Sequence, residues 1–225
     1  MIPVLLTVIA LISYFCGSVS TVNLTSNLYF HRNILKDYPR DNDGITRFIK
    51  DYGIKGAVVL FGTEAVKVAV PVILGGLLMG MTDHSDVGRA FAMFCILLGT
   101  VFPVMYDFKG ETSFVAFCVC ILFVSTGTAF IMLIVFLAVY FLTHYVSLSS
   151  LAAAAAMCVG SVMMVDSDIV RRIMLFMAIL IFVEYRQSIV RLARGKEEKF
   201  VYQKDISYMF DDNKEPVRNK MKWKE

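Results

Sequence analysis

The chain has few of the residues that build metal centres, disulfide frameworks or catalytic triads. Its three histidines, His31, His84 and His144, are too scattered to form one site, and no Ser/His/Asp set is visible. Its five cysteines form no CxxC pair and all stand inside apolar runs, where a thiol acts as a small buried hydrophobe. We therefore expect no metal site, no disulfide and no cofactor.

The first apolar stretch also lacks the positively charged residues that precede the apolar part of a signal peptide, which favours a retained helix over a cleaved one. The chain is instead rich in hydrophobic residues. Of its 225 residues, 57% are hydrophobic, against about 45–50% in soluble domains, and the mean hydropathy is +0.66. This composition predicts a membrane protein with several spans, and nothing in it points to nucleic acid.

Seven apolar stretches can be separated, and most approach the ~20 residues that a helix needs to cross the hydrocarbon core. The run 112–143 is too long for one upright helix, and Ser125–Thr128 divides it into two short ones. The predicted spans are 2–28, 57–79, 89–107, 112–124, 127–143, 147–164 and 170–192.

The connections between these spans differ in charge. The segment 29–56 and the residues after 185 are rich in Lys and Arg, whereas 80–88, 125–128 and 165–169 carry neither. Basic connections stay in the cytoplasm. The sequence thus predicts an all-α polytopic membrane protein with seven transmembrane helices, some short, the N-terminus outside and the C-terminus cytoplasmic. Residues 1–200 form the membrane domain, and 201–225 form a polar cytoplasmic tail.

Glu64 and Lys67 stand three residues apart inside an apolar span, on one face of the helix. Ionisable groups at membrane depth are costly and are usually functional. A neutralised pair that only closes the helix bundle explains the spacing equally well, and the sequence leaves both interpretations open.

Cations gather at the side predicted to be cytoplasmic. Lys109 lies in the short turn 107–113, where it can anchor a helix end or, with Gly110, hold a phosphate. Arg186, Arg191 and Arg194 lie at the inner end of the last span, and Arg47 lies in the first basic connection. Each arginine alone fits ordinary positive-inside topology, whereas the set together suggests an anionic headgroup or substrate.

Six blocks of the chain, in order, resemble the bacterial integral-membrane acyl-phosphate:glycerol-3-phosphate acyltransferases of the PlsY type. Block 99–110 resembles the GHxxPxxxxFKGGKG motif of that family, 145–150 its YVSLAS element, and 186–197 its HRxNIxRLxxGxE motif. Blocks 17–19 and 64–71 resemble its GSI/GSV and DFxKGxxP elements, and 46–53 resembles the stretch after its Gly/Ser-rich loop. The resemblance covers about residues 10–200.

The resemblance implies a reaction at the cytoplasmic face of the bacterial plasma membrane. The sn-1 hydroxyl of glycerol 3-phosphate, or of a related anionic acceptor, attacks an acyl phosphate to give lysophosphatidic acid, without a metal. It implies Arg47 and Lys109 as catalytic residues, and Lys67 with Glu64 would also order the core of the bundle. The implied substrate-binding residues are Ser18, Lys67, Ser147, Ser149, Tyr185, Arg186, Ser188 and Arg191.

Several positions depart from the family pattern. Residues 37–44 read DYPRDNDG where the family has its Gly/Ser-rich phosphate loop, and these acids would repel a phosphate. Thr100, Thr112, Tyr185 and Ser188 replace a His, a Lys, a His and an Asn of the family motifs.

The sequence therefore leaves two hypotheses. The first is a divergent acyltransferase in phospholipid synthesis. The second is a catalytically inactive homologue that binds a phospholipid or a membrane-protein partner through residues 37–43 and 201–225. A small-solute transporter ranks last, because inverted repeats and paired broken helices are lacking.

Overall fold

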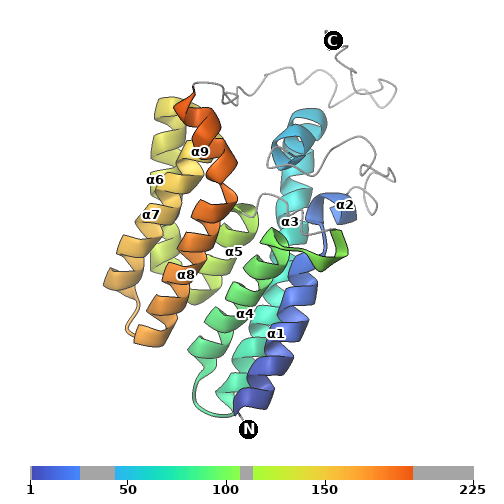
Figure 1. The fold of residues 1–225 in the computed structure, drawn as a ribbon, viewed down its shortest axis with the longest axis vertical. Coiled ribbons are helices and arrows are strands. Elements are labelled where there is room, and N and C mark those ends of the chain that lie inside the picture. The colour runs from blue at the N-terminus through green and yellow to red at the C-terminus, as the bar shows by residue number, and fades with distance from the viewer. Residues whose placement is uncertain (1, 26–43, 107–113, 195–225) are drawn as a thin grey trace.

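A computed structural model of the chain describes residues 2–25, 44–106 and 114–194 (Figure 1). Every regular element in these ranges is helical, which confirms the predicted all-α class. The elements are α1 (Ile2–Ser18), α2 (Thr21–Thr25), α3 (Gly44–Gly80), α4 (Ser85–Val101), the 3-10 turn η3 (Val104–Tyr106), α5 (Phe114–Val124), α6 (Thr126–Thr143), α7 (Val146–Met164), α8 (Asp168–Glu184) and α9 (Arg186–Ala193).

Three helices in the described ranges are long and apolar enough to cross a membrane: Lys55–Gly80 of α3, and α6 and α7. A fourth results if α8 and α9, which meet at a bend of 53°, count as one span. The predicted span 2–28 is not continuous, because α1 ends at Ser18 and α2 begins at Thr21. The predicted span 170–192 is likewise bent at Tyr185.

The division of the 112–143 run is confirmed. Helix α5 ends at Val124 and α6 begins at Thr126. The Ser125 hydroxyl oxygen between them accepts from the backbone N–H of Thr128 at 3.3 Å, and the Thr128 hydroxyl donates to it at 2.9 Å. Since the first N–H groups of a helix have no partner within the helix, this serine caps α6 and starts it anew.

Most of the helices pack around one large apolar core, and a smaller cluster of Ile9, Met79 and Ala92 lies between α1, α3 and α4. Helix α4 contacts α1, α3, α5 and α8, while α7 packs between α6 and α8 (Figure 1). The buried side chains at its centre come from six helices, and they include Val68, Met93, Phe117, Met132, Met157 and Met177. Segments far apart in the sequence are thus fixed against one another by burial of large side chains from which water and lipid are excluded.

The helices alternate in direction, so the connections fall at two ends of the bundle. The N-terminal end of α1, the turn 81–83 and the connection 165–167 lie toward one end, while the α6–α7 connection and α9 lie toward the other (Figure 1). The first end is not free of basic residues, because Arg89 and the neighbours Arg171 and Arg172 stand in the opening turns of α4 and α8. Charge counted over connections alone missed these three, and the orientation in the membrane stays a prediction.

Helices α1 and α4 touch backbone to backbone through two glycines. A Cβ atom on Gly17 would lie 2.2 Å from the carbonyl oxygen of Ile96, and one on Gly99 would lie 2.2 Å from that of Tyr14. The Tyr14 hydroxyl donates to the carbonyl of Phe102 at 2.7 Å, next to the same crossing. Small residues permit this close approach of helices, so both glycines are required by packing.

We expect Gly17→Ala and Gly99→Ala each to lower the free energy of unfolding by about 1–3 kcal/mol, as overpacking does, because a backbone carbonyl cannot move aside. Gly62→Ala is the control. A Cβ there meets nothing within 4 Å, and alanine favours the helix by up to ~1 kcal/mol. Denaturant titration in one detergent measures all three, and equal stability of the three variants would contradict the packing assignment.

Candidate active site

A buried polar cluster from α3 closes the break between α1 and α2. The Lys67 Nζ atom lies 2.9 Å from Glu64 Oε1, donates to the Thr21 hydroxyl oxygen at 2.7 Å, and donates to the carbonyl of Val19 at 3.3 Å. The Thr21 hydroxyl in turn donates to the second carboxylate oxygen of Glu64. The predicted proximity of Glu64 and Lys67 on one helix face is confirmed.

The cluster holds Lys67 from three sides. The ammonium group donates two hydrogen bonds, to the Thr21 hydroxyl and the Val19 carbonyl, and forms an ion pair with Glu64. The Lys67 and Glu64 side chains are only 7% and 6% exposed. This geometry favours a positioning role, in which the pair holds the α1–α2 break against α3. Direct contact of Lys67 with substrate, which would require exchange of one of these acceptors, stays a prediction.

Thr21 was missed by reasoning from the sequence. The available signal was the adjacent hydroxyl pair Ser20-Thr21 shortly after Gly17, inside a stretch otherwise read as one apolar span. Hydroxyl side chains compete for backbone partners and favour helix ends. That competition places a helix break here, and the break exposes the Val19 carbonyl to Lys67.

Two further residues of the family blocks are used in packing α1 against α4. The Thr100 hydroxyl lies within donor distance of two carbonyls, that of Ile96 at 2.9 Å and that of Gly17 at 3.2 Å. Ser18 is buried, and its hydroxyl donates to the Tyr14 carbonyl at 2.9 Å. Thr100, which stands where the family has a histidine, therefore stabilises the end of α1. Ser18 directly precedes the residue whose carbonyl contacts Lys67.

A second group of predicted residues lies on α7 and α9, which pack against each other. Tyr185 is buried at the α8–α9 bend, and Arg186 is exposed as the first residue of α9. The Arg191 guanidinium donates to the hydroxyl of the buried Ser188 at 3.1 Å. The arrangement fixes one guanidinium of the set, because Ser188 holds it from the same helix.

The serines predicted on α7 stand in its first turn. Ser149 is buried and donates to the carbonyl of Tyr145 at 2.8 Å, while Ser147 is partly buried. Figure 1 shows the start of α7 and the helix α9 at the same end of the bundle. The structure thus brings Ser147 and Ser149 to the end that carries the predicted α9 residues.

The two predicted catalytic cations, Arg47 and Lys109, belong to other parts of the chain. Arg47 belongs to the part of α3 that precedes Gly53, where the helix is broken by a left-handed backbone with φ 61° that favours glycine. Lys109, Thr112, the acidic residues 37–43 and the predicted tail 201–225 lie outside the described residues. The roles given to Arg47 and Lys109 stay predictions.

The titratable residues of the described ranges do not gather into a metal centre. No group of three or more His, Cys, Asp or Glu side chains there is arranged to hold an ion. The five cysteines are all free thiols and are buried or partly buried within the helices. Among the carboxylates of these ranges, Glu64 is the one with a buried side chain.

Comparison with known proteins gives the family. The family model described as glycerol-3-phosphate acyltransferase matches residues 7–195. The chain belongs to this family. A glycerol-3-phosphate acyltransferase of Finegoldia magna is 27% identical over 198 residues, which cover 86% of this chain and 96% of that protein. The resemblance seen in the six sequence blocks is confirmed.

Two solved structures share the fold. Both are crystal structures of PlsY (YgiH), an integral membrane glycerol 3-phosphate acyltransferase. Its lysophosphatidic acid form has a TM-score of 0.74 at 21% identity and covers 87% of this chain and 95% of that one. Its glycerol 3-phosphate form has a TM-score of 0.73 at 20% identity and covers 92% and 99%. The chain has the all-helical fold of an integral membrane protein with several spans.

The polar cluster predicts a graded loss of stability. Lys67→Met leaves the Glu64 carboxylate buried without its cation and should lower the free energy of unfolding by roughly 3–5 kcal/mol. Thr21→Val removes a shared hydroxyl and should cost about 1–3 kcal/mol. Glu64→Gln combined with Lys67→Met should be less destabilising than Lys67→Met alone, because no unpaired charge remains.

The matched control is Asp168→Asn. It removes an ion pair with Arg171 of the same spacing and the same 2.9 Å separation, but the Asp168 side chain is 73% exposed. Exposed pairs contribute about 1 kcal/mol or less. Unfolding of all variants in the same detergent measures the series. A loss for Lys67→Met no larger than that for Asp168→Asn would contradict the anchoring role.

Proposed function

We propose that this protein transfers an acyl group from an acyl phosphate to glycerol 3-phosphate, giving lysophosphatidic acid for phospholipid synthesis. The observation that carries the proposal is the family match over residues 7–195, which spans nearly all of the helical part of the chain. The glycerol 3-phosphate form of the solved PlsY supports this acceptor. Retention of Arg47, Lys109, Arg186 and Arg191 supports a site for phosphate groups.

The proposal includes a topology and a location. Residues 1–200 form a seven-span domain with the N-terminus outside, and residues 201–225 form a cytoplasmic tail. The predicted phosphate-binding end then faces the cytoplasm, where soluble glycerol 3-phosphate is available. The membrane is the plasma membrane of a bacterium, as the bacterial source of the relatives supports.

The acceptor hydroxyl attacks the carbonyl carbon of the acyl phosphate. A new C–O ester bond forms, the bond between the acyl carbon and the phosphate oxygen breaks, and inorganic phosphate leaves. Arg47 and Lys109 stabilise the negative charge that develops on the leaving phosphate and the carbonyl oxygen. With no histidine at positions 100 and 185, the phosphate of a substrate takes the hydroxyl proton.

The remaining site residues bind and orient. Arg186 and Arg191 hold the phosphate of glycerol 3-phosphate, with Ser188 fixing the Arg191 guanidinium. Ser147, Ser149 and Tyr185 line the same end of the bundle. Lys67 and Ser18 act indirectly, by keeping the α1–α2 break in place.

One observation favours a second candidate, an inactive homologue that binds a phospholipid or a membrane-protein partner. The Thr100 hydroxyl lies against two backbone carbonyls, and Ser188 is paired with Arg191, so two substituted positions have structural uses. Such uses are expected where a chain has lost catalysis and kept its fold. An assay of acyl transfer distinguishes the active enzyme from the inactive homologue.

The decisive experiment incubates purified full-length protein in lipid with long-chain acyl phosphate and labelled glycerol 3-phosphate. We expect labelled lysophosphatidic acid, and a loss of 100-fold or more in Lys109→Ala and in Arg47→Ala, since a charge-stabilising group contributes about 10²–10³ in rate. Arg172→Ala removes an arginine at the other end of the bundle and should retain the wild-type rate. Absence of product beside an active family enzyme would refute the proposed reaction and leave the binding role.

A finer test concerns the pair on α9. Ser188→Ala should lower kcat/KM for glycerol 3-phosphate about tenfold, mainly through KM, because a hydrogen bond to a charged group contributes ~1.5 kcal/mol. Ser150→Ala is the control, since this buried α7 serine only donates to the carbonyl of Val146. Steady-state kinetics with varied acceptor concentration measure both. Equal effects of the two substitutions would contradict a positioning role for Ser188.

A further inference from the structure

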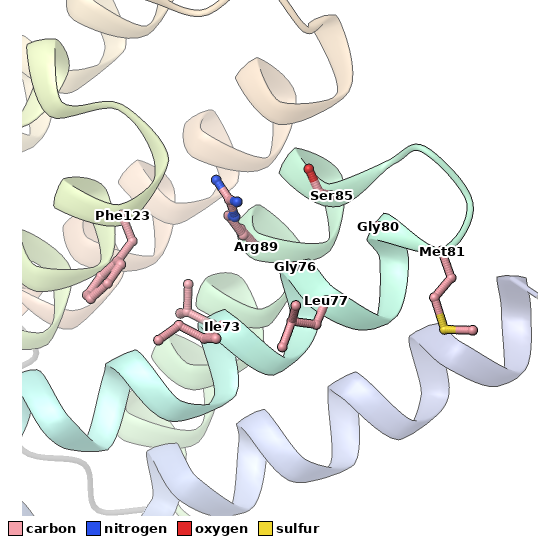
Figure 2. Close-up of a pocket in the computed structure, with 9 residues that line it drawn as sticks. Ile73, Gly76, Leu77, Gly80, Met81, Ser85, Arg89 and Phe123 are labelled. Atoms are coloured by element: carbon pink, nitrogen blue, oxygen red, sulfur yellow. The ribbon is translucent and has the colours of Figure 1, made fainter.

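A groove of about 620 Å³ lies far from the residues proposed for acyl transfer. It runs between α3 and α4, with Phe123 of α5 on its other side (Figure 2). It begins near Gly80 and Met81, at the end of the bundle opposite α9 (Figure 1). Its volume is in the range of pockets that hold small ligands.

Glycines give the groove its shape. Gly75 and Gly88 bring α3 and α4 into backbone contact, since a Cβ on Gly88 would lie 2.3 Å from the carbonyl oxygen of Gly75. Gly76 leaves space that the Arg89 side chain fills, because a Cβ there would lie 2.9 Å from Arg89 Nε and 3.0 Å from its Cγ. The missing side chain at Gly76 therefore lets Arg89 lie across α3 at the groove.

The described lining of the groove is apolar apart from Arg89 and Ser85. Figure 2 shows Arg89 extending from α4 beside Gly76, with Ile73 and Leu77 of α3 along the hollow. Ile73 and Leu77 are more than half exposed, as side chains that face acyl chains would be. The groove thus joins a surface suited to hydrocarbon with one cation near the end of the apolar span Lys55–Gly80.

The charge of Arg89 is only weakly compensated. Its Nη1 atom lies 3.6 Å from Asp86 Oδ1, and both side chains are largely open, at 46% and 76% exposed. An exposed pair at that separation contributes little, and other donors of the guanidinium fork remain for a second anion. A basic group beside an apolar groove at the edge of a membrane span is suited to the phosphate of a lipid.

We propose that this groove binds one anionic phospholipid, with its phosphate at Arg89 and an acyl chain along α3. The face of α3 from Val72 to Gly80 provides about 12 Å of length at 1.5 Å per residue, enough for a substantial part of one chain. Arginine binds phosphate through parallel N–H donors, which a zwitterionic headgroup engages less strongly. The lipid here is a bound component of the fold, separate from the substrate and product of acyl transfer.

Native mass spectrometry of the delipidated full-length protein, titrated with phosphatidylglycerol or phosphatidylcholine, tests the proposal. We expect one saturable phosphatidylglycerol with at least tenfold preference over phosphatidylcholine. Arg89→Gln should remove that preference, and Ile73→Trp should weaken both lipids by filling the groove while keeping the arginine. Arg172→Ala is the control, because it removes an exposed arginine of α8 outside the groove and should leave binding unchanged.

Each other outcome counts against the proposal. Equal affinity for the two lipids, or equal losses in Arg89→Gln and Arg172→Ala, would refute recognition of an anionic lipid by Arg89. If inorganic phosphate competes with equal affinity, the natural ligand is a soluble anion. If acyl phosphate displaces the lipid, the groove holds the acyl chain of the acyl donor. Unfolding midpoints show whether each variant is folded. If Arg89→Gln does not fold, Ile73→Trp still tests binding in the groove. The result does not depend on whether the protein catalyses acyl transfer.

Discussion

The packing of the α1–α2 break against α3 depends on the buried pairing of Lys67 with Glu64 and Thr21. A helix break that is buried away from water leaves backbone carbonyls without partners, and Ser18, Ser20 and Thr21 around this break are buried. Lys67 supplies a donor to the carbonyl of Val19 at the break, while Glu64 neutralises the charge that this requires. The cluster therefore allows α1 to stop at Ser18, and it ties the residues that follow to the middle of α3.

Helix α4 carries the second constraint, which is steric. Gly99 lies against the backbone of α1, and Gly88 lies against the backbone of α3 at the other end of the same helix. Two such contacts fix the depth and rotation of α4 between its neighbours. One consequence is that Thr100 is held at α1, and another is that Arg89 reaches across Gly76 into the groove. A single helix thus connects the proposed catalytic end with the proposed lipid groove.

The substitutions in the family motifs have a physical interpretation at two positions. Thr100 replaces an imidazole with a hydroxyl that two backbone carbonyls can engage, and Ser188 replaces an amide with a hydroxyl that holds Arg191. Both keep a polar atom where the fold needs one. Lys109, Arg186 and Arg191 keep cations of the motifs, whereas Thr112 replaces one lysine. The retained charges are consistent with chemistry that depends on phosphate charge more than on a protein base.

The sequence by itself determined the helical membrane class, the division at Ser125, the closeness of Glu64 to Lys67 and the family. These follow from apolar composition and stretch length, from a polar interruption, from helix spacing and from motif order. Tertiary structure decided the rest. Thr21 joins Lys67 across 46 residues, and Arg89 becomes the wall of a groove only because α3 has no side chain at Gly76. Contacts between distant segments depend on which backbones can approach each other closely. The residue pattern of one helix does not show which other helix packs against it.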